Sequence, residues 1–255
     1  MPRFRVIAQR RGSMRLPIAP ARSDGSCFDT LTRGVPKGTS ADSSMFQGGN
    51  AGPEPINPEA ARLPQGYEFG MRALERESSL LLVVDVQLRL VEAMPSSAAS
   101  MLVKNTLILL ETARLLGISV LATEQYPKGL GATVSPLGET LASLGVKPIE
   151  KMTFDACGEP AMDEELAKLA PRSVVLVGIE AHVCVFQTAR ELANRGIDVR
   201  VASDAVASRN PAHCERGLAL SERAGAAVMP TESIVFDWLR RAGSDEFKAI
   251  SKLVR

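Results

Sequence analysis

Cys184 is the residue whose type and surroundings most clearly indicate chemistry. It follows the apolar run Val174–Val177 and Gly178 by a few residues, and an amphipathic pattern over 185–192 comes after it. An apolar β-branched run, a glycine and a pattern of helical period predict a buried strand that leads into a helix. A cysteine near the N-terminus of a helix meets the positive end of the helix dipole, which favours the thiolate. Cys184 is therefore a candidate nucleophile that needs a base and a cation nearby.

Two other chemically capable residues stand at the ends of predicted strands. Asp85 ends the apolar run Ser79–Val84, and Lys151 ends a weaker strand predicted over Val146–Glu150. In an open parallel sheet, ligands bind outside the carboxyl ends of the strands. Asp85 can accept the thiol proton of Cys184, and Lys151 can hold both anionic groups in place. The sequence therefore predicts one site made of these three side chains.

The segments that must position these residues alternate between strand and helix patterns along the chain. Such alternation is typical of βαβ units, which form a mostly parallel sheet with helices on both faces. The order of the strands does not follow from the pattern. Further strands are predicted at Ile118–Ala122, Asp198–Ala202 and Ala226–Met229, a polar loop at Thr123–Gly131, and helices at Ala98–Leu116, Asp163–Leu169, Pro211–Ala224 and Thr231–Arg241, the last with Thr231 as N-cap.

The composition argues against several classes of protein. The 30 basic and 29 acidic residues nearly cancel, so we expect neither a nucleic acid nor a membrane as partner. Four cysteines without CxxC spacing argue against a disulfide framework and fit a reducing, cytoplasmic compartment. With only His182 and His213 in the chain, we expect no metal site, and without GxGxxG or GxxxxGK[ST] motifs we expect no nucleotide cofactor.

Residues 1–72 differ in composition from the rest of the chain. They are rich in Gly, Pro, Ser and Arg and show no regular period, and residues 1–23 contain six arginines and no acid. Two interpretations stay open: a transit peptide, which would direct the protein to mitochondria, and a disordered leader or upstream extension. We expect an atypical N-terminal extension over 1–72 and one domain of about 180 residues over 73–255.

Several motifs of this domain resemble those of a known superfamily. They are LLVVDVQ (81–87), TEQYPKGLG (123–131), IEKMTFDAC (149–157) and GIEAHVCVFQTA (178–189), with SDA (203–205) and TES (231–233) in support. The chain from about Leu80 to Ser233 resembles the isochorismatase-like cysteine hydrolases, which include nicotinamidases and N-carbamoylsarcosine amidase. Within that superfamily it is most similar to the isochorismatase domain-containing proteins.

The resemblance implies a fold and a site. The fold is a Rossmann-like three-layer αβα sandwich with a six-stranded, mostly parallel sheet. The implied catalytic triad is Asp85, Lys151 and Cys184. A cis peptide bond is implied before Glu180, with the backbone N–H groups of Glu180 and Cys184 forming an oxyanion hole. The family also commonly forms dimers or larger homo-oligomers, so we expect self-association.

The resemblance further implies the reaction, with one departure. Nicotinamidases bind a metal through an Asp-x-His pair and a further histidine, whereas this chain has Glu124, Gln125 and Tyr126 in that region. The presence of Cys184 favours cleavage of an amide over hydrolysis of the vinyl ether of isochorismate. We therefore expect a metal-independent cysteine hydrolase that cleaves an amide-type C–N bond of a small molecule through a thioester. The alternative is a catalytically silent protein that binds a small molecule or serves as an oligomeric scaffold.

Other residues near these motifs have two possible roles each. A substrate pocket is predicted to include Gln87, Gln125, Tyr126 and Phe154, with ordering of loops or core packing as the alternative. His182 could form a dyad with Cys184, but side chains so close in sequence usually diverge at a strand-to-helix turn, so we expect a structural role. Cys157 and Cys214 are expected to be structural thiols, and Cys27 lies in the N-terminal extension.

Overall fold

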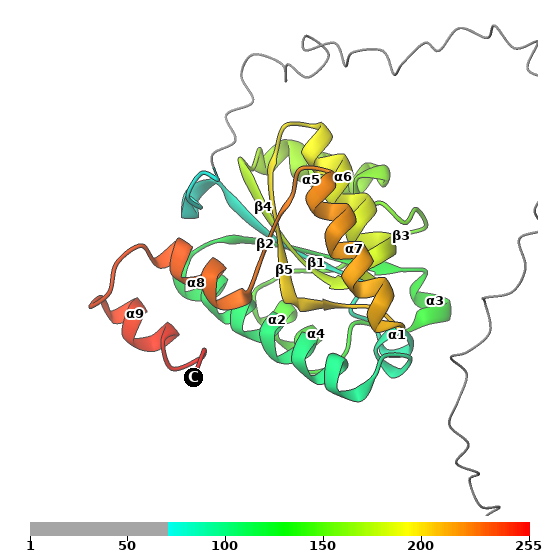
Figure 1. The fold of residues 1–255 in the computed structure, drawn as a ribbon, viewed down its shortest axis with the longest axis horizontal. Helices are drawn as coiled ribbons and strands as arrows, with labels where there is room; N and C mark the ends of the chain where they lie inside the picture. The colour runs from blue at the N-terminus through cyan, green and yellow to red at the C-terminus, as the bar shows by residue number, and fades with distance from the viewer. Residues whose placement is uncertain (1–70) are drawn as a thin grey trace, which may run out of the picture. The chain divides into compact units, whose positions relative to one another are not determined.

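The computed structural model describes residues 71–255 (Figure 1). The extension predicted over residues 1–72 lies outside the described residues except for Met71 and Arg72. The prediction that it is disordered therefore concerns residues outside the described range. Within residues 71–255, no helix combines the length and the apolar character that crossing a membrane requires.

Six strands form a parallel sheet in the order β3-β2-β1-β4-β5-β6. The two central strands, β1 and β4, are buried along their whole length. Their sequences are almost entirely apolar because helices cover them on both faces. The sheet confirms the predicted α/β class and supplies the strand order that the sequence left open. The strands are β1 (Ser79–Val84), β2 (Ser119–Gln125), β3 (Ile149–Lys151), β4 (Ser173–Ile179), β5 (Asp198–Ala207) and β6 (Ala227–Met229).

Helices cover both faces of the sheet, which confirms the three-layer arrangement (Figure 1). Successive side chains of β1 point to opposite layers: Leu81 and Val83 pack on one side, Leu80 and Leu82 on the other. The first layer contains α1 (Leu88–Glu92), α2 (Ser96–Leu116), α4 (Leu137–Ser143), α8 (Thr231–Leu239) and α9 (Asp245–Ile250), the second contains α5 (Pro160–Leu169), α6 (Phe186–Asn194) and α7 (Pro211–Arg223), and the short α3 (Pro127–Leu130) follows β2.

Three strand boundaries differ from the sequence prediction by three residues or more. β2 continues three residues into the predicted polar loop, because residues 123–125 pair with Ile149–Lys151 of β3. β5 continues to Ala207, because its end pairs with Gly178 and Ile179 of β4 beyond an irregularity in the register. β3 begins at Ile149, three residues later than predicted. In each case the neighbouring strand sets the length of the strand, and the local sequence pattern carries no information about that neighbour.

The prediction that Thr231 caps helix α8 is wrong. Pro230 occupies the N-cap position, and Thr231 is the first helical residue. The backbone N–H and the hydroxyl of Thr231 both donate to Oδ1 of Asp204, at 2.8 and 2.7 Å. Asp204 in β5 therefore takes over the capping function from a distant part of the chain. This contact connects the SDA and TES motifs.

Replacing Thr112 with valine should stabilise the domain. Thr112 is fully buried in α2, and its hydroxyl has no hydrogen-bond partner within residues 71–255. An unsatisfied buried hydroxyl is destabilising, so Thr112→Val should raise the free energy of unfolding by about 1 kcal/mol. Urea unfolding would measure the change. Thr140→Val is the matched control, since the exposed Thr140 hydroxyl donates to the carbonyl of Pro136 and its loss brings no such gain. A destabilised Thr112→Val protein would contradict this interpretation of the hydroxyl.

Candidate functional site

The three predicted site residues lie at the carboxyl ends of three nearby strands. Asp85 follows β1, Lys151 is the last residue of β3, and Cys184 lies in η3 (Ala181–Val185), a π-helical turn that follows β4. The Nζ atom of Lys151 is 2.7 Å from Oδ2 of Asp85, and both side chains are fully buried. Residues about 66 positions apart in sequence are thus joined in one buried ion pair.

The two carboxylate oxygens of Asp85 have different partners: one accepts a hydrogen bond and the other faces the ammonium of Lys151. Its Oδ1 accepts a hydrogen bond from the hydroxyl of Thr123 at 2.7 Å. Its Oδ2 lies against Lys151 and accepts no hydrogen bond of good geometry from residues 71–255. The backbone of Asp85 is in the left-handed region, with φ 51°. Aspartate tolerates that conformation better than most side chains. The carboxylate therefore has a lone pair available for a proton.

The Cys184 thiol is buried beside this ion pair, and it is held in its protonated form. Burial raises the pKa of Cys184 to about 12, and the negative charge of Asp85 contributes to the increase. The ammonium of Lys151 acts in the opposite direction and lowers the pKa. The expectation that a helix N-terminus favours the thiolate is therefore wrong for the resting protein. Cys184 lies in the η3 turn and helix α6 begins only at Phe186, so burial, and not a helix N-terminus, is the largest influence on this thiol.

Gln125 positions Lys151. Its side-chain oxygen accepts a hydrogen bond from Lys151 Nζ at 2.6 Å, and its side-chain nitrogen donates to the carbonyl of Met152. The backbone carbonyls of Thr153 and Phe154 also accept from Lys151 Nζ, at 3.1 and 3.2 Å. With Asp85, these groups surround the ammonium with acceptors. The sequence predicted Gln125 as a pocket residue, and its contact with Lys151 was not foreseen.

The buried Gln87 orders the loop that follows β2. Its amide nitrogen donates to the carbonyls of Gln125 and Gly131, at 3.0 and 2.6 Å, and its oxygen accepts from the backbone N–H of Gln125 at 2.7 Å. These contacts match the loop-ordering alternative from the sequence. The other two predicted pocket residues, Tyr126 and Phe154, are 48% and 56% exposed near the carboxyl ends of β2 and β3.

Glu180 and Arg209 form a second charged pair near the turn that carries Cys184. The peptide bond between Ile179 and Glu180 is cis. The Glu180 carboxylate accepts from the backbone N–H of Arg209 at 3.0 Å and from its guanidinium at 3.1–3.2 Å. Burial raises the pKa of Glu180, but these contacts outweigh burial and lower it overall. Arg209 was missed by the sequence analysis, although it follows β5 and the strand-end rule that found Asp85 applies to it.

Helix α7 packs closely against the η3 turn. A Cβ added to Gly217 of α7 would lie 2.5 Å from the carbonyl carbon of Ala181, so only glycine allows this approach. His182 contacts the same region: its Nδ1 is 2.9 Å from the Ser208 hydroxyl, and its ring lies 4.9 Å from that of His213. These contacts describe a structural role for His182.

The residues that stand where nicotinamidases carry metal ligands do not fit a metal here. Glu124 accepts hydrogen bonds from the backbone N–H and the hydroxyl of Thr133, and Gln125 is bonded to Lys151. Within the described part of the chain, no three His, Cys, Asp or Glu side chains cluster in a way that could hold a metal ion. Of the other described cysteines, Cys157 is buried with a pKa raised to about 12, chiefly by burial, and Cys214 is half-buried.

Replacing Gln125 with glutamate should slow alkylation of Cys184. The isosteric carboxylate would add a negative charge where Lys151 Nζ now meets a neutral acceptor. The ammonium would then lower the thiol pKa less, and one unit of pKa corresponds to about tenfold in thiolate population. We expect about tenfold slower reaction with iodoacetamide at pH 9, measured by mass spectrometry. Asn194→Asp, which adds the same charge on an exposed residue at the end of α6, should leave the rate unchanged. An unchanged rate in Gln125→Glu would contradict the assigned contact.

The fold is a parallel six-stranded α/β sheet, and an acid, a lysine and a buried thiol lie at its strand ends. These features place the chain in the class of Rossmann-like proteins. The family model described as "Isochorismatase domain" matches residues 79–233. The chain belongs to the isochorismatase family, whose fold is that of a hydrolase superfamily, and this confirms the resemblance seen in the sequence.

Similar proteins come from several eukaryotes. Isochorismatase domain-containing protein 2A of Mus musculus is 36% identical over 181 residues, which cover 70% of this chain and 84% of that protein. The secreted isochorismatase effector Isc1 of Phytophthora sojae is 37% identical over 184 residues, covering 70% and 85%. A solved structure described as MAR1 ribonuclease from Caenorhabditis elegans superposes with a TM-score of 0.67 at 34% identity, covering 72% of this chain and 92% of that one.

Proposed function

We propose that this protein is a metal-independent cysteine hydrolase that cleaves an amide-type C–N bond of a small molecule through a thioester on Cys184. The observation that supports this function most directly is the buried ion pair of Asp85 and Lys151 beside the Cys184 thiol. A buried charge pair costs desolvation energy and is a weak source of stability, so its presence beside a thiol favours a functional role.

In the proposed mechanism, Asp85 and Cys184 exchange one proton. Asp85 Oδ2 takes the thiol proton as Sγ attacks the carbonyl carbon of the amide, and the carbonyl oxygen becomes an oxyanion. The backbone N–H groups of Glu180 and Cys184 donate to that oxyanion, a contribution on the order of 10²–10³ in rate per donor. Lys151 holds the carboxylate of Asp85 in place before the transfer.

The remaining steps return the enzyme to its starting state. Protonated Asp85 gives its proton to the leaving nitrogen, the C–N bond breaks, and the amine departs from a thioester. Water then attacks the thioester carbon and gives a proton to Asp85, which passes it to the Cys184 sulfur as the C–S bond breaks. The products are one carboxylic acid and one amine for each water consumed. Tyr126 and Phe154, exposed near the strand ends, are the residues we assign to substrate contact.

The proposal is tested with a panel of small amides, ureas and carbamates. The wild-type protein should hydrolyse at least one of them, and Cys184→Ser should lose that activity. Hydroxylamine should intercept the thioester and yield the hydroxamate of the acyl part. Addition of EDTA should leave turnover unchanged, and loss of activity with the chelator would contradict the metal-independent mechanism. A panel without turnover, together with tight binding of an uncleaved compound, would favour the silent binding protein instead.

RNA is a second substrate to include, because the name of the C. elegans structure, 34% identical to this chain, describes a ribonuclease. A labelled RNA should stay intact under conditions in which amides are hydrolysed. RNA cleavage that disappears in Cys184→Ser would assign a phosphodiester, in place of an amide, to this site.

A further inference from the structure

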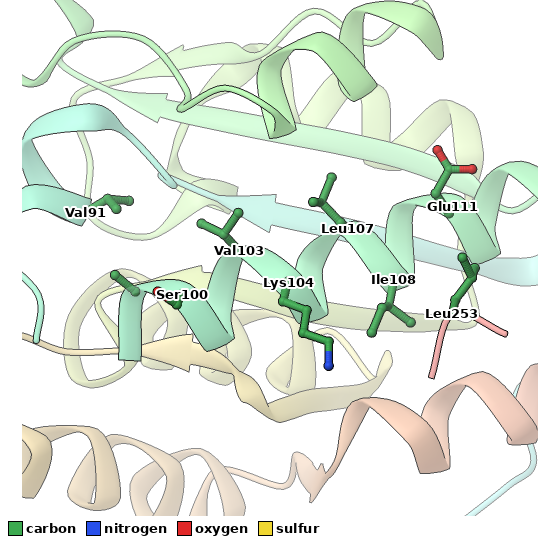
Figure 2. A pocket seen from close by; sticks show the side chains of 9 residues that line it. Val91, Ser100, Val103, Lys104, Leu107, Ile108, Glu111 and Leu253 are labelled. Carbon is green, nitrogen blue, oxygen red and sulfur yellow. The ribbon is translucent and has the colours of Figure 1, made fainter. Parts of the chain in front are cut away.

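The outer face of α2 carries a hollow of about 570 Å³ that shares no residue with the site at the strand ends (Figure 2). Most of its lining comes from α2, and the rest comes from α1 and from the C-terminal end of the chain. Ser100, Lys104 and Glu111 supply its polar atoms. Its apolar side chains are Val91, Ala99, Val103, Leu107, Ile108 and Leu253.

The lining residues of α2 form the kind of stripe with which helices pair. Ser100, Lys104, Leu107 and Glu111 follow one another at i, i+4, i+7 and i+11, the spacing that keeps side chains on one face. Figure 2 shows the side chains of Lys104 and Glu111 extending in opposite directions from this stripe, Glu111 to the same side as Leu107 and Lys104 to the same side as Ile108. A helix of this length extends about 30 Å, which is sufficient for a continuous seam with another helix.

The charges on this stripe are complementary to those on an antiparallel second copy of it. Lys104 and Glu111 lie at equal distances along the sequence from the midpoint between Leu107 and Ile108. A two-fold axis through that midpoint places each Lys104 opposite Glu111 of an antiparallel second copy, and Leu107 opposite Ile108. A parallel arrangement in register would instead oppose Lys104 to Lys104. The pattern therefore matches an isologous, antiparallel contact.

The charges of the single chain leave Lys104 uncompensated. Lys104 is exposed and makes no ion pair with any residue that the structure describes, whereas Glu111 is 2.8 Å from Arg114 of the same helix. A facing glutamate would pair the lysine at the rim of an apolar contact, where ion pairs mainly set partner and register.

We propose that this face of α2 is a homodimer interface, in which α2 pairs antiparallel with α2 of a second copy. Pairing would bury the apolar side chains of the hollow on both copies and form two Lys104–Glu111 ion pairs related by the two-fold axis. The inference is independent of the chemistry proposed for Cys184.

Sedimentation equilibrium of the full chain and two charge reversals test the interface. The wild-type protein should dimerise. Lys104→Glu and Glu111→Lys should each weaken dimerisation at least about tenfold, because each homodimer would then contain two like-charge contacts. An equimolar mixture of the two variants should associate as a heterodimer with about wild-type affinity, since both contacts in the mixed pair join opposite charges. The weakening by each single reversal is specific to the antiparallel register, because a parallel pair in register opposes like charges in the wild-type protein and in both variants alike.

One control accompanies this test, and three results would overturn the inference. Arg223→Glu, which reverses an exposed charge at the end of α7 in the other layer, should leave dimerisation unchanged, and thermal melts should show that all variants are folded. A wild-type protein that stays monomeric at all concentrations would overturn the inference. Dimers that neither reversal weakens, or weakened variants that fail to associate when mixed, would overturn it as well. Amide turnover in any of these proteins has no bearing on the result.

Discussion

Replacing Lys151 with methionine should lower the free energy of unfolding by about 3–5 kcal/mol, the cost of leaving one charge of a buried pair without its partner. Asp85 and Lys151 are both fully buried, so water cannot replace the missing ammonium. Methionine has nearly the same length as lysine, which keeps the loss of packing small. Urea unfolding of the variant and the wild-type protein at pH 7 would measure the difference.

Two comparisons separate the unpaired charge from other causes of instability. The double variant Asp85→Asn/Lys151→Met removes both charges and should recover a large part of the lost stability. Lys151→Met should also become more stable on acidification. Protonation of Asp85 at low pH removes the unpaired buried charge, so the variant gains stability as the pH falls and loses it again as the pH rises. Equal instability of the single and double variants, at all pH values, would show that the charge is not the cause.

The strand-end residues were the part of the site most open to prediction from the sequence. Asp85 and Cys184 follow runs of Leu and Val that are buried on both faces, and such runs identify central parallel strands without knowledge of their partners. Because carboxyl ends of parallel strands meet at one edge, residue type and position together predicted the meeting of Asp85 with Lys151.

The parts that could not be predicted depend on contacts between distant segments. The end of β2 looked like a polar loop, since its pairing with β3 involves residues about 26 positions away. The contact between Gln125 and Lys151 follows from that same pairing. The protonation state of Cys184 was predicted wrongly, because the sequence indicates a helix dipole but does not reveal how deeply the thiol is buried. Local patterns therefore identified the chemical groups, and tertiary contacts determined their ionisation.

Replacing Asp85 with asparagine should lower amide turnover by about 10²–10⁴, the usual contribution of a positioned general acid and base. In the proposed mechanism the variant cannot accept the thiol proton or protonate the leaving nitrogen. Asparagine tolerates the left-handed backbone at φ 51°, so the turn should keep its shape. Turnover of the best substrate from the amide panel would be compared with that of the wild-type protein at a temperature where both are folded.

The same substitution should make the Cys184 thiol ionise at lower pH. In the wild-type protein the carboxylate of Asp85 raises the thiol pKa and Lys151 lowers it, with burial setting the value near 12. Alkylation by iodoacetamide should therefore keep increasing with pH beyond 10. Without the carboxylate, a thiolate would be the anion that faces Lys151 in this site, and the alkylation profile should shift to lower pH. Turnover and alkylation would then change in opposite directions at pH 8. A variant in which amide turnover and the alkylation rate both fall would contradict the role of Asp85 as proton carrier. Displacement of the Cys184 thiol would be sufficient to explain that result.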